Sequence, residues 1–203
     1  KLLIATRNRA KLAEATFLLK DFNLELHSLD DLGISGTPEE TGATFEENAI
    51  AKARYYGTLA GMPTLTDDGG LEIDALGGWP GVYSRRIFGR GTPEATDEAM
   101  IAESLRRLEG VPVGERGCSF TFVMALFVPP GTVHRGYGSV RGHIPSSPAP
   151  ERVPGFPFRS IFFIPQLGKT IAQLTPGEQA EFMNHRKTAI LQLAPYLHNL
   201  SSL

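Results

Sequence analysis

The first twenty residues combine an apolar stretch, a polar turn and a segment with helical periodicity. Residues 2–5 are all apolar and are typical of a short buried strand. Polar residues fill positions 6–9, and from about residue 10 to residue 20 the apolar positions Leu12, Ala15 and Leu19 recur on one helix face. A strand, a turn and a helix in this order indicate a protein of the α/β class.

Further helices are predicted from their start and stop signals. Thr44 and Glu47 form a capping-box pattern, which predicts a helix that continues to about Ala60. Thr92-Pro93 supplies a cap and a first-turn proline for a helix that ends at Gly110. A C-terminal helical region runs over residues 175–197, with an interruption near residue 184.

Strand patterns alternate with these helices. Apolar or alternating runs predict strands at 64–66, 120–128, 133–140 and 161–164, and the turn at 129–131 predicts a hairpin. We therefore expect an α/β fold with a mixed sheet flanked by helices, an arrangement that leaves room for two lobes and a cleft.

The composition mainly excludes certain classes of protein and site. The 203 residues carry 20 Lys and Arg against 22 Asp and Glu, whereas a domain that coats nucleic acid usually has a strong basic excess. The single cysteine, Cys118, excludes an intramolecular disulfide and a multi-cysteine metal site, and its strand-like neighbours favour a buried, inert thiol. The apolar run near the start, residues 2–5, is too short for a signal peptide or a membrane span. We expect a cytoplasmic protein without nucleic-acid or membrane partners.

Two segments carry the residue types that bind phosphate. The turn at residues 6–11 precedes a helix and contains Lys11, and helix N-termini attract anions, although a capped helix with a solvated basic turn is the simpler interpretation. Asn48 and Lys52 are four residues apart and project from one helix face. An ordinary charged helix explains that pair unless Lys52 meets an anionic partner.

Two further segments contain residues that could bind a metal ion or a nucleobase. Asp67 and Asp68 end a predicted strand, and adjacent carboxylates on a strand point to opposite faces, so one of them is expected to face a cleft. A carboxylate there suits Mg²⁺ together with phosphate oxygens, and a plain Asp-Gly turn explains the residues equally well. His185 and Arg186 follow Asn184 at a helix start, where they suit a base and a phosphate.

In this order, the segments resemble the Ham1/inosine triphosphate pyrophosphatase family over essentially the whole chain. The matching segments are Ala5-Thr6-Arg7-Asn8 with Lys11, Glu40-Thr41-Gly42-Ala43-Thr44-Phe45 with Glu47-Asn48-Ala49 and Lys52-Ala53, Asp67-Asp68 with Gly70-Leu71, Leu76-Gly77-Gly78-Trp79-Pro80-Gly81-Val82-Tyr83-Ser84 with Arg86, Gly155-Phe156 with Ile161-Phe162-Phe163, Gly168-Lys169-Thr170, and His185-Arg186.

The resemblance implies a fold and an activity. Family members have an elongated mixed sheet flanked by helices, with two lobes around a nucleotide cleft, and they are usually homodimers. They use Mg²⁺ to hydrolyse dITP, ITP and XTP to the monophosphate and pyrophosphate. We accordingly expect one Ham1-like domain over residues 1–203.

The same resemblance assigns roles to residues. Glu40 and Asp68 would hold the metal, Asp68 would be the base for water attack at the α-phosphorus, and Lys52 would act with it on the phosphates. Phe156 would stack on the base. Substrate contacts are expected at Thr6, Arg7, Asn8, Arg9, Ala10, Lys11, Gly69, Arg86, Phe156, Pro157, Phe158, Arg159, Lys169, Ala180, His185 and Arg186.

The chain departs from the family pattern where the base would be read. Arg159 replaces an acidic residue, Ala180 replaces a lysine, and Asn184 and Gly69 each replace a serine. We therefore predict that pyrophosphate release is retained and that base preference is altered or relaxed. The alternatives are a nucleotide-binding protein with weak or no turnover, and an unrelated Mg²⁺ phosphohydrolase that releases orthophosphate.

Overall fold

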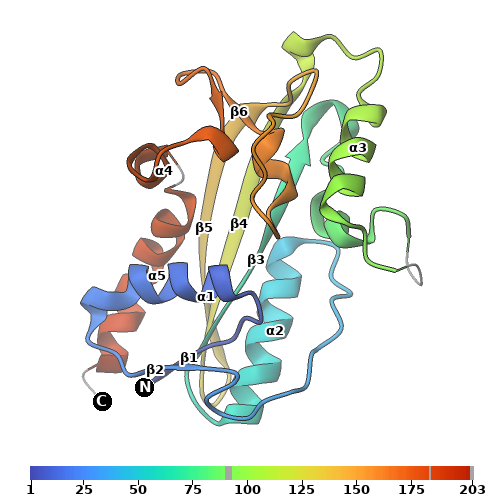
Figure 1. The fold of residues 1–203 in the computed structure, drawn as a ribbon. Coiled ribbons are helices and arrows are strands. Elements are labelled where there is room, and N and C mark those ends of the chain that lie inside the picture. Colours follow the sequence, from blue (N-terminus) through green and yellow to red (C-terminus); the bar gives the residue numbers. More distant parts are fainter. Residues whose placement is uncertain (90–92, 183, 202–203) are drawn as a thin grey trace. The chain divides into compact units, whose positions relative to one another are not determined.

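Seven strands form one mixed sheet in the computed structural model, which describes residues 1–89, 93–182 and 184–201 (Figure 1). The strand order is β2-β1-β3-β4-β5-β6-β7, with β1 parallel to β2 and β3, and β6 antiparallel to β5 and β7. The strands are β1 (Leu2–Ile4), β2 (Leu26–Ser28), β3 (Thr64–Ile73), β4 (Gly117–Val128), β5 (Thr132–His143), β6 (Phe163–Ile164) and β7 (Lys169–Thr170).

Helices surround this sheet, so the prediction of an α/β fold with a mixed sheet is confirmed. The α-helices are α1 (Arg9–Leu19), α2 (Phe45–Ala60), α3 (Asp97–Arg107), α4 (Pro176–Phe182) and α5 (His185–Ser201). Short 3₁₀ helices are η1 (Lys20–Phe22), η2 (Asp74–Leu76), η3 (Gly81–Arg86), η4 (Val113–Glu115), η5 (Pro157–Ser160) and η6 (Ile171–Gln173).

The capping residues account for one correct and one wrong prediction of a helix start. The capping box of Thr44 and Glu47 is present at the start of α2, as expected. The predicted start of the next helix at Thr92-Pro93 is wrong, because Thr96 caps α3 by accepting a hydrogen bond from the Ala99 backbone N–H at 3.2 Å. Pro93 therefore precedes the helix, and Thr92 lies outside the described residues.

The chain divides into two compact units whose segments interleave. Unit 1 comprises residues 1–68, 122–138 and 185–203, and unit 2 comprises residues 69–121 and 139–184. The strands β3, β4 and β5 each pass from one unit into the other. The nucleotide cleft and the single domain over residues 1–203 stay predictions.

In unit 1, the side chains of β1 alternate between two hydrophobic clusters. Leu2 and Ile4 pack in a cluster with buried residues of α1 and α5, and Figure 1 shows these two helices next to each other. Leu3 and Ala5 pack instead with Tyr56 of α2. This period of two is what a strand buried on both faces requires, and it places α2 on the face opposite α1 and α5.

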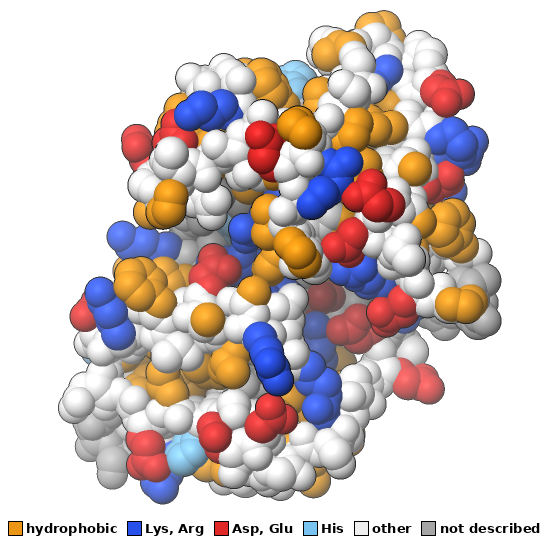
Figure 2. Space-filling view, in the orientation of Figure 1, with side chains coloured by type: hydrophobic (Ala, Val, Ile, Leu, Met, Phe, Trp, Pro, Cys, Tyr) orange, Lys and Arg blue, Asp and Glu red, His pale blue; other side chains and the backbone are white. Residues whose placement is uncertain are grey.

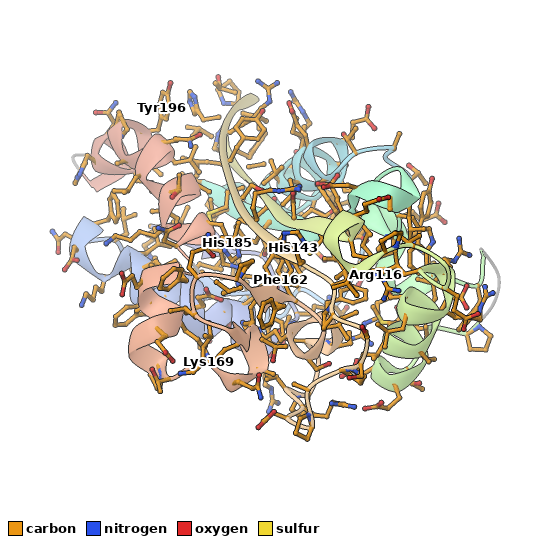
Figure 3. All side chains as sticks on the ribbon, turned by 90° about the horizontal axis from the view of Figure 1, so that it is seen from above. Arg116, His143, Phe162, Lys169, His185 and Tyr196 are labelled. Carbon is orange, nitrogen blue, oxygen red and sulfur yellow. The ribbon has the colours of Figure 1, made fainter. Side chains whose placement is uncertain are left out.

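In unit 2, the core is built around Phe162. Its ring stacks on the Phe120 ring with centroids 4.6 Å apart, and Figure 3 shows it surrounded by other side chains. Cys118 is fully buried in the same cluster. The prediction of a buried cysteine is therefore confirmed.

Two glycines of β5 let the backbone of α5 approach the strand closely. A Cβ atom at Gly138 would lie 1.9 Å from the carbonyl oxygen of His185, and one at Gly136 would lie 2.0 Å from that of Ala189. No real Cβ tolerates such distances, so a side chain at either position would displace the first turns of α5.

Helix length and surface charge bear on possible membrane and nucleic-acid partners. Among the described residues, no helix is long and apolar enough to cross a bilayer. On the face shown in Figure 2, Lys and Arg side chains are interspersed with Asp and Glu side chains.

Cys118 is expected to be inert in the folded protein. Burial raises the pKa of its thiol to about 12, and only the thiolate is nucleophilic, so iodoacetamide at about pH 8 should leave it unmodified. Mass spectrometry should detect complete alkylation only after denaturation in guanidinium chloride. Rapid alkylation of the native protein would contradict the buried position.

The Gly138→Ala variant is expected to destabilise the fold by about 1–3 kcal/mol, because its methyl group would overlap the backbone of α5. Chemical denaturation monitored by circular dichroism measures the change. Gly131→Ala is the matched control, since no atom lies within 4 Å of a Cβ at Gly131. Equal stability of the two variants would contradict the close contact between β5 and α5.

Candidate functional site

The first turn of α1 is organised by the side chain of Asn8. Its Oδ1 accepts hydrogen bonds from the backbone N–H groups of Ala10 and Lys11 at 2.9 and 3.3 Å, while the Thr6 Oγ1 accepts from the backbone N–H of Asn8 at 3.2 Å. These bonds leave the Asn8 amide and the Thr6 hydroxyl hydrogen as donors. An anion at this turn would therefore meet side-chain donors rather than the capped N–H groups.

The two arginines of the turn differ in their surroundings. Arg7 donates to Thr37 Oγ1 and to the carbonyl oxygens of Ile34 and Gly36, so its guanidinium holds the segment at residues 34–37. Arg9 is exposed at the start of α1. Neither guanidinium has a contact that assigns it to a ligand.

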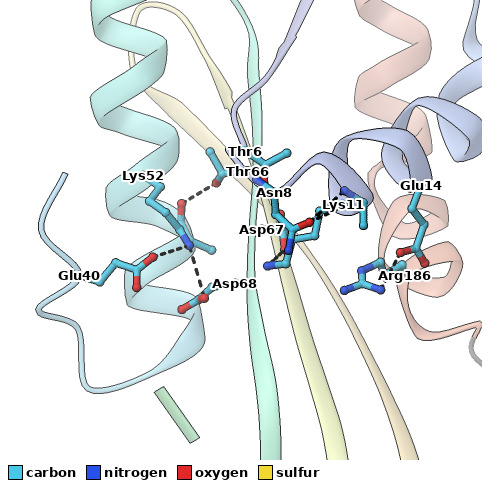
Figure 4. A network of polar contacts seen from close by, with 12 residues as sticks. Thr6, Asn8, Lys11, Glu14, Glu40, Lys52, Thr66, Asp67, Asp68 and Arg186 are labelled. Atoms are coloured by element: carbon cyan, nitrogen blue, oxygen red, sulfur yellow. Dashed lines mark hydrogen bonds and ion pairs between the residues drawn. The ribbon is translucent and has the colours of Figure 1, made fainter. Parts of the chain in front are cut away.

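Lys52 of α2 lies between two carboxylates. Its Nζ is 2.9 Å from Glu40 Oε1 and 3.4 Å from Asp68 Oδ1, as Figure 4 shows. The neighbouring Thr66 hydroxyl donates to the Ala49 carbonyl oxygen at 2.7 Å and ties β3 to α2 at this point. On the sequence alone, Lys52 counts as an ordinary surface residue unless it has an anionic partner. The structure gives it two such partners, Glu40 and Asp68.

A second lysine meets the other aspartate of the pair. Lys11 Nζ lies 2.5 Å from Asp67 Oδ2, and this contact is on the α1 side of β3, since Leu65 packs with α1 and Thr66 bonds to α2. Successive side chains of a strand point to opposite faces, so Asp67 meets α1 and Asp68 meets α2.

Burial and charge shift these ionisable groups in different directions. Burial raises the pKa of Asp68, and the nearby Glu40 adds to the rise, while Lys52 opposes it; the net pKa is above the ordinary value. For Asp67, burial raises the pKa, but Lys11, Lys52 and Arg186 together outweigh it, so the net pKa is lowered. The pKa of Lys52 would fall through burial, but the surrounding carboxylates raise it. Of the two aspartates, Asp68 is therefore the better proton acceptor.

His185 and Arg186 begin α5 and pack on one aromatic ring. The Phe122 ring of β4 contacts His185 edge-on at 5.7 Å, and the Arg186 guanidinium lies 4.5 Å from its centroid. Arg186 also pairs with Glu14 of α1 at 2.8 Å (Figure 4). These contacts fix the orientation of the guanidinium within unit 1.

The side chains of this cluster carry a net negative charge, which a bound cation would balance. Three cationic side chains face four carboxylates, which gives the set one net negative charge: Lys11, Lys52 and Arg186 against Glu14, Glu40, Asp67 and Asp68. Within the described part of the chain, no three His, Cys, Asp or Glu side chains are grouped to hold a metal by themselves. Mg²⁺ typically binds one or two carboxylates together with phosphate oxygens, so Glu40 and Asp68 fit such an ion.

The remaining predicted residues belong to unit 2. The Arg159 guanidinium lies 4.2 Å from the centroid of the Phe156 ring, and both side chains are partly exposed, whereas Pro157 and Phe158 are buried. Phe158 packs in the hydrophobic core, so its described role is structural.

Four other predicted residues of unit 2 are not joined to that pair by a described contact. Lys169 pairs with Glu178 at 2.7 Å, and Arg86 donates to the Val82 carbonyl oxygen at 3.4 Å. Ala180 is exposed on α4, and Gly69 follows Asp68 directly on β3. The roles expected for these residues stay predictions.

Sequence reasoning did not name Glu14, and it named Asp67 and Asn48 only as general candidates for a metal or phosphate site. Asp67 and Glu14 each pair with a cation of the site, and Asn48 accepts a hydrogen bond from the Gly42 N–H at 2.9 Å. Helical spacing contains a signal for Glu14, because it lies three residues after Lys11 and projects from the same face of α1. Strand alternation contains the signal for Asp67.

Comparison with known proteins gives consistent matches. The sequence profile of the Ham1 family matches residues 2–196. A dITP/XTP pyrophosphatase from Geobacter sulfurreducens is 40% identical over 197 residues, covering 97% of this chain and 96% of the relative. The dITP/XTP pyrophosphatase of Escherichia coli strain K12 is 38% identical over 201 residues, covering 98% of each chain.

Solved structures agree with the sequence matches. The Coxiella burnetii HAM1 protein superposes with a TM-score of 0.83 at 35% identity, covering 98% of each chain. The Staphylococcus aureus Ham1 protein superposes with a TM-score of 0.82 at 31% identity, covering 98% of this chain and 99% of that one. The full-length sequence match and these superpositions lead to one conclusion: the chain belongs to the Ham1 family.

Proposed function

We propose that this protein hydrolyses non-canonical purine nucleoside triphosphates, namely dITP, ITP and XTP, to the monophosphate and pyrophosphate with Mg²⁺ as cofactor. The observation that carries the proposal is the partly buried Lys52 ammonium held between Glu40 and Asp68. This arrangement places a cation for phosphate oxygens beside a carboxylate that can accept a proton. The relatives from Geobacter sulfurreducens and Escherichia coli are dITP/XTP pyrophosphatases, which supports the choice of substrate.

The triphosphate would be held by the first turn of α1 and by two lysines. Thr6 and Asn8 retain side-chain donors for phosphate oxygens, and Lys11 and Lys52 supply positive charge. Catalysis of phosphoryl transfer depends largely on positioning and on neutralising the charge that develops on the departing group. The two lysines are poised for that task because carboxylates already fix their positions.

Asp68 would act as the general base. A water molecule attacks the α-phosphorus, its proton passes to the Asp68 carboxylate, and the bond from the α-phosphorus to the bridging oxygen of pyrophosphate breaks. The raised pKa of Asp68, caused chiefly by burial, makes its carboxylate a better proton acceptor than an ordinary aspartate.

Mg²⁺ would be bound by Glu40 and Asp68 together with phosphate oxygens. When bound, it supplies positive charge against the negative charge of the triphosphate. The acidic excess of the side-chain cluster supports this assignment, because a triphosphate would otherwise meet a site of its own sign.

The base would be read by Phe156, Arg159, His185 and Arg186. The Phe156 ring offers a stacking surface, and the Arg159 guanidinium lies over it. A guanidinium has only donors, so it favours the carbonyl acceptor at the purine 6-position and disfavours the adenine amino group. It has no feature that separates guanine from hypoxanthine at that edge. The proposed base preference is therefore relaxed among 6-oxopurines.

The assembly and location implied by the resemblance remain predictions. These are a homodimer, a cytoplasmic location, and the absence of nucleic-acid and membrane partners. A nucleotide-binding protein with weak turnover is the competing function, and the position of Arg159 over Phe156 favours it, because a base must displace or cover that guanidinium.

Asp68→Asn is expected to lower pyrophosphate release by about 10²- to 10⁴-fold, the usual loss on removing a general base. Pyrophosphate and orthophosphate are quantified separately with ITP as substrate. Glu25→Gln is the matched control, because Glu25 is an exposed carboxylate paired with Lys1. A parent protein that binds ITP without releasing pyrophosphate would support the competing function, and orthophosphate as the first product would contradict the proposed bond cleavage.

Arg159→Asp is expected to change the ratio of kcat/KM for ITP over GTP by about tenfold, the effect of one hydrogen-bond mismatch of about 1.4 kcal/mol. The parent should use ITP, XTP and GTP with similar kcat/KM and should discriminate against ATP. Arg106→Ala is the control, since Arg106 is an exposed residue of α3 paired with Glu103. A tight preference of the parent for ITP and XTP over GTP would contradict the relaxed pocket.

A further inference from the structure

Asn48 is a buried polar residue to which the catalytic scheme gives no task. It lies on α2, one turn before Lys52, and only 1% of its surface is exposed. Its Oδ1 accepts the hydrogen bond from the Gly42 backbone N–H at 2.9 Å. Because a backbone N–H only donates, this bond fixes the amide orientation and directs Nδ2 to the other side.

The Nδ2 side of this amide is buried without a partner. Nδ2 has no hydrogen-bond partner among the described residues, which is costly for a group with two donors. The geometry therefore anchors the amide through Oδ1, which holds the backbone of Gly42.

The Gly42 contact controls the segment that carries Glu40. Residues 39–43 have no regular secondary structure, so their position depends on such bonds. A Cβ at Gly42 would lie 2.7 Å from Asn48 Oδ1 and 2.8 Å from Glu47 Cβ, so this position is packed directly against α2. The Glu47 carboxylate accepts a hydrogen bond from the next backbone N–H, that of Ala43, at 2.6 Å.

We propose that Asn48 is a positioning residue that holds Glu40 beside Lys52, and thereby sets the affinity of the site for a divalent cation. It does so through Oδ1, which holds the segment that carries Glu40 by the backbone N–H of Gly42. This role rests on the proposed function, which assigns Glu40 and Asp68 to Mg²⁺. Residues behind metal ligands commonly change metal affinity by about 10- to 100-fold when they are replaced.

The test measures binding without turnover. The α,β-methylene analogue of ITP, which lacks the scissile oxygen bridge, is titrated calorimetrically into the parent and the variants in Mg²⁺ and in EDTA. The parent should bind more tightly in Mg²⁺. Asn48→Ala and Gly42→Ala should each lose about 10- to 100-fold of that Mg²⁺-dependent gain and keep the parent affinity in EDTA.

Controls separate positioning from folding. Gly42 belongs to an irregular segment, so Gly42→Ala carries the test if Asn48→Ala fails to fold. Gly114→Ala is its matched control, because no atom lies within 4 Å of a Cβ at Gly114. In a pyrophosphate assay, the Mg²⁺ concentration for half-maximal rate should rise in both site variants, and saturating Mg²⁺ should recover most of kcat.

Three outcomes would overturn the inference in distinguishable ways. Variants that keep the full Mg²⁺-dependent gain while the parent releases pyrophosphate would overturn the role of Asn48 alone. An equal loss of affinity in Mg²⁺ and in EDTA would assign Asn48 to the fold rather than to the cation. A parent with neither pyrophosphate release nor a Mg²⁺-dependent gain would overturn the proposed function together with this inference.

Discussion

The partly buried ammonium group of Lys52 is the constraint around which unit 1 is organised. A cation withdrawn from water needs compensating negative charge, and here it draws Glu40 from an irregular segment and Asp68 from the middle of β3 toward one helix. The capping box of Thr44 and Glu47 fixes where that helix starts and therefore where Lys52 lies. Local helix chemistry thus determines the position of a charge that three separate segments of the chain share.

Each cation of the cluster is paired with a carboxylate before any ligand arrives. Lys11 pairs with Asp67, Lys52 with Glu40 and Asp68, and Arg186 with Glu14. Fixed partners reduce the conformational freedom of long side chains, so less is lost when a ligand binds. The acidic partners also keep the cluster close to neutral, in line with the balanced charge of the whole chain.

Local sequence patterns predicted most helices and strands of the fold. They named some of the side chains that form the charged cluster, but not how these side chains pair. The alternation of β1, the start of α2 and the break between α4 and α5 follow from local patterns. The start of α3 was misplaced because two threonines had suitable signals, and Thr96, which Asp97 and Glu98 follow, is the one that caps the helix. Alternation shows that Asp67 and Asp68 face opposite sides of β3, but the pairing of Asp67 with Lys11, 56 positions away, leaves no local pattern.

The interleaved connectivity of the two units limits how this protein can change. Unit 1 is assembled from three separate stretches of sequence and unit 2 from two. A contiguous stretch that includes all of unit 1 spans the whole chain, whereas one that includes all of unit 2, residues 69–184, also carries residues 122–138 of unit 1. Neither unit can therefore be exchanged or fused as one contiguous segment without residues of the other.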